Sequence, residues 1–208
     1  MDAHIFVDNS NIFGGAQRAA GTHEPEAVWM AVRVYYKNFF KLIEHGHRPV
    51  TKILAGSVPP GNEALWKYAR RGGYSTDLLQ KIENDNGNLA EQGVDEMIHL
   101  KIANALLDHD PPQKLVLATG DGNLSDFDTS FVRQTERALK QGWKVEIWSW
   151  EEQLSGRYNS IEVPSHKALQ INLLDNYYKK VTFIQGGTYD ISGSKVNLSG
   201  RVVHKLQL

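Results

Sequence analysis

The sequence contains no cysteine, which excludes a disulfide-stabilised scaffold, a thiolate metal site and a cysteine nucleophile. It also lacks a run of the ~20 apolar residues that a membrane-spanning helix needs, and its first residues do not resemble a secretion signal. Neither sign of charge dominates, because 23 Lys+Arg stand against 24 Asp+Glu. We therefore expect an intracellular protein with no membrane partner, in the cytoplasm or alternatively in the nucleus. A polyanionic partner would need a local basic patch.

Short apolar runs alternate with amphipathic segments along most of the chain. Apolar residues make up 41% of the 208 residues, which is enough for a folded core. Four runs are typical of buried strands: residues 4–8, 50–56, 114–121 and 143–150. Four segments are typical of helices: residues 26–44, 62–73, 94–109 and 127–142. This alternation predicts an α/β fold, a three-layer α/β/α sandwich with a central parallel sheet.

The chain changes character after about residue 180, where β-branched runs are interrupted by Gly-Gly and Ser-Gly pairs. This pattern predicts a last strand of the sheet near residues 181–184, followed by a hairpin. We therefore expect a domain of residues 1–185 with a small C-terminal β extension of residues 186–208. An exposed strand edge in that extension could pair with a second copy, so a homodimer is a further expectation.

Two aspartates stand where predicted parallel strands end. Asp8 ends the first strand and Asp121 the third. Ligands of open parallel sheets bind beyond the carboxyl ends of the strands, so both side chains should reach the same edge. The alternative is that each caps a following helix or turn, which aspartate does routinely.

A third acid is expected to face the sheet from the helix predicted at 94–109. On a helical wheel, Asp95 falls inside the apolar arc that contains Val94, Ile98 and Ile102, whereas Glu96 points the opposite way. A carboxylate on the buried side of a helix is costly unless a cation or a donor meets it. Alternatively, Asp95 is favoured in the first turn by the helix dipole. Both interpretations can hold at once.

Asp126 is a fourth candidate, because it lies five residues beyond Asp121 in a loop that can fold back to the same edge. Its alternative role is to cap a helix starting at Phe127. Several carboxylates brought together repel one another unless divalent cations neutralise them, and oxygen ligands select Mg²⁺ or Mn²⁺. Such a site suits hydrolysis of a phosphodiester. Ser10 and Asn11 could orient a water, a ligand or a substrate phosphate there.

Three segments taken together resemble the NYN branch of the PIN-like metal-dependent nucleases: FVDNSNIFGG, GVDEMI and VLATGDGNLSDF. The similarity extends over about residues 4 to 150. It implies an Mg²⁺- or Mn²⁺-dependent ribonuclease, an endonuclease that cuts single-stranded or structured RNA and leaves 5′-phosphates. It also implies that Asp8, Asp95 and Asp121 are the metal-binding, catalytic acids and that Asn11 accompanies the first of them.

The chain departs from that family in the third segment. Many relatives have a second aspartate two residues after the third acid, where this chain has Asn123, so Asp126 becomes the candidate for the fourth ligand. Two alternatives to a ribonuclease therefore stay open. One is a catalytically weak or inactive RNA-binding or scaffold module of the same fold, and the other is a nuclease that acts on DNA.

Several side chains are candidates for substrate contact. The basic candidates are Arg18, which follows the first acid, Arg70 and Arg71 at the end of one predicted helix, and Arg133 on another. Phe13 and Trp150 could stack on bases. More often, arginines in such positions lie on a solvated helix face and aromatic residues complete a core, which we expect for Trp148. His45 and His47 are expected to be surface residues at the opposite edge of the sheet.

Overall fold

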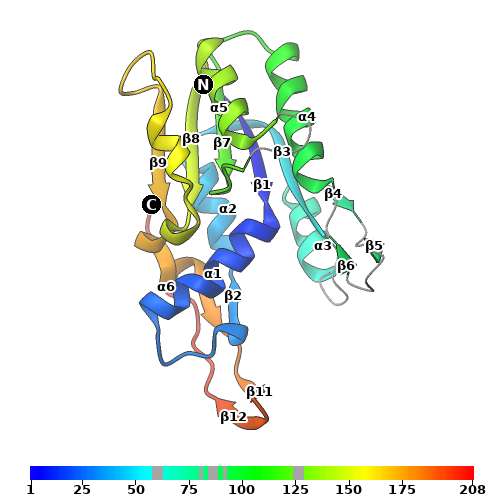
Figure 1. Ribbon diagram of the computed structural model, residues 1–208, viewed down its shortest axis with the longest axis vertical. Coiled ribbons are helices and arrows are strands. Elements are labelled where there is room, and N and C mark those ends of the chain that lie inside the picture. The colour runs from blue at the N-terminus through cyan, green and yellow to red at the C-terminus, as the bar shows by residue number, and fades with distance from the viewer. Residues whose placement is uncertain (58–62, 80–81, 84–88, 91–92, 124–128) are drawn as a thin grey trace.

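The fold rests on a central sheet of six strands in the order β4-β3-β1-β7-β8-β9. The structure is a computed structural model, and it describes residues 1–57, 63–79, 82–83, 89–90, 93–123 and 129–208 (Figure 1). The strands are β1 (Asp2–Asp8), β3 (Arg48–Ser57), β4 (Ser75–Leu79), β7 (Lys114–Ala118), β8 (Lys144–Ser149) and β9 (Leu169–Leu173). Every neighbouring pair is parallel. The four predicted strands are confirmed, but β7 ends at Ala118, so Asp121 follows this strand in a loop and does not end it as predicted.

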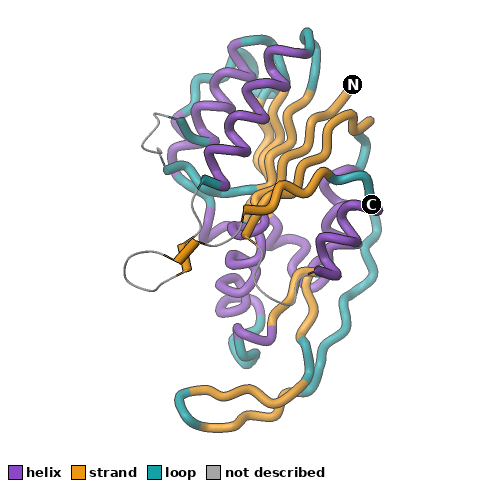
Figure 2. Tube along the Cα trace, turned by 90° about the vertical axis from the view of Figure 1, so that its right-hand side faces the viewer, coloured by secondary structure: helices purple, strands orange, loops and turns teal. Residues whose placement is uncertain are grey.

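Helices cover both faces of this sheet (Figure 2). One layer contains α1 (Asn9–His23), α2 (Tyr36–Glu44), α3 (Glu63–Arg71) and the short α6 (Tyr178–Val181). The other contains α4 (Val94–Asp108) and α5 (Phe131–Lys140). The described part of the chain also contains four 3₁₀ turns: η1 (Trp29–Ala31), η2 (Glu151–Gln153), η3 (Gly156–Ser160) and η4 (Leu174–Tyr177). The predicted three-layer α/β/α sandwich is therefore confirmed.

Each layer encloses its own part of the core. Phe39, Trp66 and Ile12 are buried on the α1 side of the sheet, and Ile98 and Phe131 on the α4 side. Because strands β1 and β7 are apolar on both faces, they lie at the centre of the sheet, where both cores need apolar side chains.

Among the residues that the structure describes, three antiparallel pairs lie outside the main sheet. They are β2 (Val32–Val34) with β10 (Thr182–Ile184), β5 (Ile82–Glu83) with β6 (Leu89–Ala90), and β11 (Gly187–Ile191) with β12 (Ser194–Leu198). The last pair forms the expected hairpin and projects from the body (Figure 1). The prediction that residues 181–184 form the last strand of the main sheet is wrong, because β10 pairs with β2. Instead, β9 forms the edge strand beside β8. It was not predicted, because the polar residues Gln170 and Asn172 interrupt its apolar pattern.

The helix predicted at 26–44 is correct only for its second half. Its first half contains η1 and β2, since Val32 and Val34 point into the core on either side of Arg33 and pair with β10. Alternating β-branched residues favour a strand, and here they outweigh an apolar spacing that also fits a helix.

Helix α1 was not predicted, because glycines at 14, 15 and 21 lower its helix propensity. It forms because Ile12, Ala16, Ala19 and Ala20 are all buried against the sheet. Helix α5 begins at Phe131 rather than Phe127, with the Ser130 side chain accepting from the backbone N–H of Arg133. The N-cap of α5 is therefore Ser130, and Asp126, the proposed cap, lies outside the described residues.

The prediction that His47 is a surface residue is wrong. Its side chain is mostly buried, and its Nε2 lies 3.3 Å from a carboxylate oxygen of Glu146. Lys114 contacts the same carboxylate at 2.9 Å. Burial raises the pKa of Glu146, but hydrogen bonds from His47 and Lys114, together with their charges, outweigh burial and lower that pKa from 4.5 to about 2.

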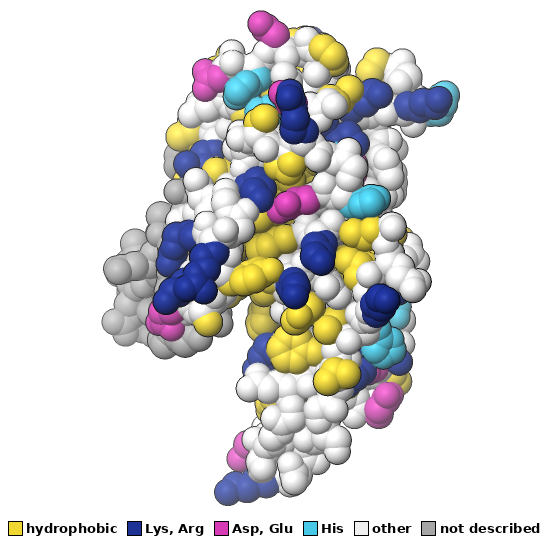
Figure 3. Space-filling model, turned by 180° about the vertical axis from the view of Figure 1, so that it is seen from behind, with side chains coloured by type: hydrophobic (Ala, Val, Ile, Leu, Met, Phe, Trp, Pro, Cys, Tyr) yellow, Lys and Arg dark blue, Asp and Glu magenta, His cyan; other side chains and the backbone are white. Residues whose placement is uncertain are grey.

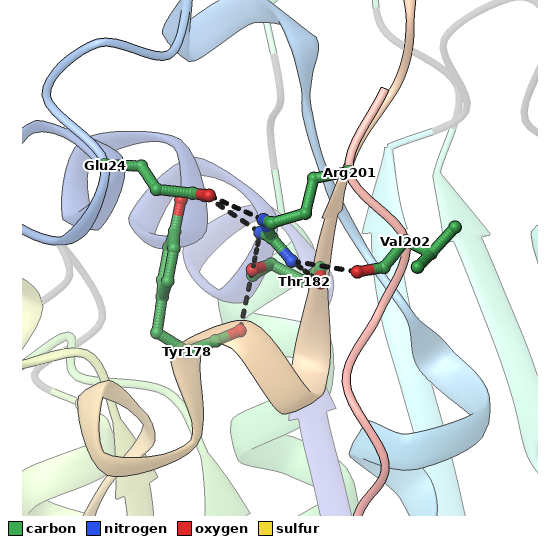
Figure 4. A network of polar contacts seen from close by, with 5 residues as sticks. All are labelled: Glu24, Tyr178, Thr182, Arg201 and Val202. Carbon is green, nitrogen blue, oxygen red and sulfur yellow. Dashed lines mark hydrogen bonds and ion pairs between the residues drawn. The ribbon is translucent and has the colours of Figure 1, made fainter. Parts of the chain in front are cut away.

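The last residues of the chain return from the hairpin to the body. Arg201 pairs with Ile184 through the backbone, and its guanidinium binds both carboxylate oxygens of Glu24, at 2.6 and 2.9 Å (Figure 4). It also donates to the carbonyl and the hydroxyl oxygen of Thr182. Glu24 is the C-cap residue of α1. The C-terminal segment is thus attached to the far end of the helix that begins at Asp8.

Candidate active site

The candidate site lies where the sheet changes direction. From β1 the chain proceeds outward to β3 and β4, and it then returns to the other side of β1 to build β7, β8 and β9. A crevice forms beyond the carboxyl ends of strands at such a switch point. Here it is a pocket of about 440 Å³, lined by Asp8, Asp95, Glu96 and Asp121, which we call the acidic pocket.

Asp8 both ends β1 and begins α1. One of its carboxylate oxygens accepts from the backbone N–H of Asn11 at 3.0 Å, which makes it the N-cap, as its alternative interpretation predicted. The other oxygen accepts from the Thr119 hydroxyl at 3.1 Å. The side chain is almost fully buried, so capping fixes its direction at the base of the pocket.

The three residues after Asp8 have separate tasks. Asn9 is buried, and its side-chain oxygen accepts from the Tyr36 hydroxyl. Ser10 lines the acidic pocket. The side-chain oxygen of Asn11 accepts from the backbone N–H of Gly120 at 2.9 Å, so Asn11 connects the start of α1 to the loop after β7. The polar run after β1 therefore joins two strands at their carboxyl ends.

The loop after β7 is held by hydrogen bonds between residues close in sequence. The backbone N–H of Asp121 donates to the Thr119 hydroxyl, and the Asp121 carboxylate accepts from the backbone N–H of Asn123 at 2.9 Å. Position 120 must be glycine, because a Cβ there would lie 2.2 Å from the Ser149 hydroxyl and 2.4 Å from the carbonyl oxygen of Gln153. The tight packing holds the loop so that Asp121 lines the same pocket as Asp8.

The negative charge of the acidic pocket contributes to the pKa values of two ring side chains, Tyr158 and His99. The Tyr158 hydroxyl donates to the carbonyl of Asp121, and burial, aided by the charges of Asp121 and Asp8, raises its pKa. Burial lowers the pKa of His99 to about 4, although the charges of Glu96 and Asp121 act in the opposite direction. His99 is therefore neutral at pH 7 and supplies no counter-charge to the acids.

Helix α4 brings the remaining acids to the pocket. It follows Gly93, which has a left-handed backbone with φ of 82°, and its first turn contains Asp95 and Glu96. Asp95 lines the pocket as predicted, and its first-turn position also fits the helix dipole. The prediction that Glu96 points away is wrong, because Glu96 also lines the pocket. The first turn of α4 borders the cavity, so the neighbouring residues Asp95 and Glu96 both reach it.

The predicted substrate residues divide into two groups. Ser10, Asn11 and Arg18 line the acidic pocket, although Arg18 lies on α1 rather than in a loop. Gln153 in η2 also lines it, and sequence reasoning missed this residue because its position depends on the return of the chain after β8.

The other candidates lie elsewhere. Phe13 is half-buried against the core, and Trp150 is fully buried with its indole N–H donating to the carbonyl of Ile12, so the stacking role predicted for Trp150 is wrong. Arg70 and Arg71 end α3, and Arg133 lies on α5 beside Glu136; none of the three lines the pocket. Lys and Arg side chains surround a strip of apolar surface on the face seen in Figure 3.

The donors around the pocket fit a hard divalent cation. Carboxylates of Asp8, Asp95, Glu96 and Asp121 are oxygen ligands of the kind that Mg²⁺ and Mn²⁺ prefer. Within the described ranges, however, no three His, Asp or Glu side chains are grouped closely enough to hold an ion. These residues therefore fit a divalent cation in the chemistry of their donor atoms and in the cavity that they share. Asp126, the candidate fourth ligand, lies outside the described residues.

Comparisons with known proteins bear on the fold. No family model and no curated protein matches the sequence. The crystal structure of a protein of unknown function from Vibrio parahaemolyticus is similar, with a TM-score of 0.58 and 16% sequence identity over 84% of this chain and 94% of that chain. At this identity the similarity supports the α/β/α architecture alone. Among the helices that the structure describes, none is both long and apolar enough to cross a bilayer.

Proposed function

We propose that this protein is a ribonuclease of the NYN type that uses Mg²⁺ or Mn²⁺ to hydrolyse phosphodiester bonds within RNA, leaving 5′-phosphates. The observation that supports this most is the shared pocket of Asp8, Asp95 and Asp121, which come from β1, α4 and the loop after β7. Asp8 and Asp121, which lie more than a hundred residues apart in the sequence, line one pocket at the switch point of the sheet. As part of this proposal, the enzyme acts in the cytoplasm.

In this proposal one or two of the carboxylates of Asp8, Asp95 and Asp121 would hold the cation, because Mg²⁺ usually keeps several waters and also binds substrate phosphates. When bound, the cation would supply activation of a water molecule and stabilisation of the leaving oxygen. Thr119 and the α1 backbone hold the Asp8 carboxylate in place, so little reorganisation is needed when substrate binds. Arg18 faces the same pocket and supplies the positive charge that a substrate phosphate needs beside these acids.

Cleavage of a labelled single-stranded RNA in Mn²⁺ tests the proposal. Asp121→Asn and Asp95→Asn should each lower the rate by about 100-fold or more, a loss typical of a removed electrostatic group. Asp108→Asn is a matched control, since Asp108 is exposed near the end of the same helix as Asp95. Cleavage that persists in EDTA or in Asp121→Asn would refute the mechanism. A parallel DNA substrate distinguishes a deoxyribonuclease.

A second candidate is an RNA-binding or scaffold module with the same fold. It is favoured by Asn123, which stands where many NYN proteins have a carboxylate. This candidate predicts RNA affinity that does not change in Asp8→Ala, and no turnover with Mg²⁺ or Mn²⁺.

The homodimer remains a proposal that rests on the projecting β11–β12 hairpin. Its test is the mass of the full chain in solution by light scattering. Deleting residues 186–208 is not a suitable test, because the deletion would also remove Arg201 from its buried contacts with Glu24.

A further inference from the structure

A second pocket, of about 550 Å³, adjoins the acidic pocket along α1. Gly14 and Arg18 line both pockets, and Gln17, Gly21 and Trp29 complete the second, which we call the α1 groove. Residues 14, 17, 18 and 21 share one helix face, and the helix rise makes this stretch about 10 Å long. The α1 groove therefore leads directly away from the carboxylates.

Trp29 is the wall of the α1 groove, and its exposure is exceptional in this molecule. The chain has five tryptophans; 57% of the Trp29 surface is exposed, whereas the other four are at most 6% exposed. An indole offers a large, flat apolar face on which another ring can stack. An exposed indole beside a pocket of ligand size is thus a stacking platform for a planar group.

The floor of the α1 groove consists of glycines that packing does not require. A Cβ at Gly15 would lie 2.3 Å from the Trp150 ring, so that position has a structural reason for glycine. Gly14 and Gly21 have no described atom within 4 Å of a Cβ, and neither has positive φ. Helical glycine is less stable than alanine. Their effect is to keep the groove free of side chains.

We propose that the α1 groove binds the nucleotide next to the scissile phosphate of a single-stranded RNA, with its base stacked on Trp29 and its phosphate at Arg18. This inference rests on the proposed function, because the acidic pocket would hold the phosphate that is cleaved. Arg18 lies between the two pockets, and its guanidinium matches phosphate geometry.

A single strand fits this arrangement better than a duplex. A base reaches an aromatic platform only when it is unstacked from its neighbours, as in loops and single strands. Base stacking tolerates every base, so the α1 groove should bind RNA with little sequence preference.

Binding is measured without cleavage by titrating the full chain with labelled oligoadenylate RNA in EDTA. Trp29→Ala should weaken affinity by about 5- to 150-fold, the range for one stacked base, while Trp29→Phe should retain most of it. Gly14→Leu should also weaken binding, because Gly14 lines both pockets and a Cβ at this position has no described atom within 4 Å, so the added side chain would occupy their junction. Leu107→Ala is the control, since Leu107 is 78% exposed on α4 and lines neither pocket.

Acrylamide quenching gives a second readout, because Trp29 is the accessible tryptophan. RNA should shield it, and shielding should be absent in Trp29→Phe. The proposal that the α1 groove binds RNA would be overturned by unchanged affinity in both Trp29→Ala and Gly14→Leu, or by bound RNA that does not shield Trp29. Binding of oligodeoxyadenylate with no binding of RNA would overturn RNA as its ligand. If RNA shields Trp29 but is never cleaved, the α1 groove is supported and the proposed nuclease activity is refuted. If RNA is cleaved but does not shield Trp29, the nuclease activity is supported and the role of the α1 groove is refuted.

Discussion

Replacing Arg201 by methionine should reduce the free energy of unfolding by about 3–5 kcal/mol, the usual effect of removing one partner of a buried ion pair. Methionine keeps most of the apolar stem and removes the charge. The measurement is urea denaturation of the full chain at pH 7, followed by fluorescence of its tryptophans. The same variant should leave the start of α1 folded, because Asp8 and Asn11 make their contacts at the other end of that helix.

The magnitude follows from the surroundings of the pair. Only 7% of the Glu24 side chain and 17% of the Arg201 side chain are exposed, and two parallel hydrogen bonds of 2.6 and 2.9 Å join them. Arg201 also donates to Thr182 and lies over the Tyr178 ring, with 5.7 Å from Cζ to the ring centroid. Without Arg201, Glu24 would be a buried carboxylate with no cation, and Thr182 would lose a donor.

A double-mutant cycle isolates the pair. Glu24→Gln and Arg201→Met should each destabilise the protein, and the double variant should be more stable than the sum of the two predicts, because no uncompensated charge remains. We expect a coupling of at least about 2 kcal/mol. A loss below about 1 kcal/mol in Arg201→Met, as for a surface ion pair, would refute the assignment of this pair as buried and structural.

Three further changes test the loop after β7 and the buried Glu146 cluster. Gly120→Ala should destabilise the protein by about 1–3 kcal/mol, because its Cβ would overlap the Ser149 hydroxyl and the Gln153 carbonyl; a Gly156→Ala control, with open space around it, should change the urea midpoint little. Thr119→Val should lose about 1–3 kcal/mol by leaving the Asp8 carboxylate and the Asp121 N–H without this hydroxyl, whereas Thr119→Ser should retain most stability in the same titration. For Glu146, whose pKa falls from 4.5 to about 2 on folding, the stabilisation is complete above pH 4.5 and is lost as pH falls to 2. Thermal melts of wild type and Glu146→Gln should therefore differ by about 3 kcal/mol at pH 6 and converge near pH 2; a difference independent of pH would contradict this.

The central sheet could be predicted because its strands are apolar on both faces. β1, β3, β7 and β8 stand out as short apolar runs, and parallel order follows from the helices between them. β9 could not be found in this way, because an edge strand tolerates Gln170 and Asn172. Helix α1 was missed for a related reason: its glycines argue against a helix locally, and only the burial of its alanines explains why it forms.

The acids of the candidate site could be predicted from two rules, that strand ends meet at one edge and that Asp95 faces inward. Glu96, Gln153 and Trp29 could not, since their positions depend on how α4, η2 and η1 are placed against α1. The positions of Arg70, Arg71 and Arg133 away from the pocket likewise depend on which side of the sheet each helix crosses. The spacing of residues along a helix predicts which of them share a face, but it does not predict which other element that face contacts.

The hydrogen bond between Thr119 and Asp8 joins segments 111 residues apart, so the pocket is assembled late during synthesis. At 5–20 residues per second, β1 waits roughly 6 to 22 s for the strand that completes its edge. During that interval the nascent chain has its first acid but no pocket. Whatever chemistry this edge performs is therefore withheld until synthesis has passed Thr119.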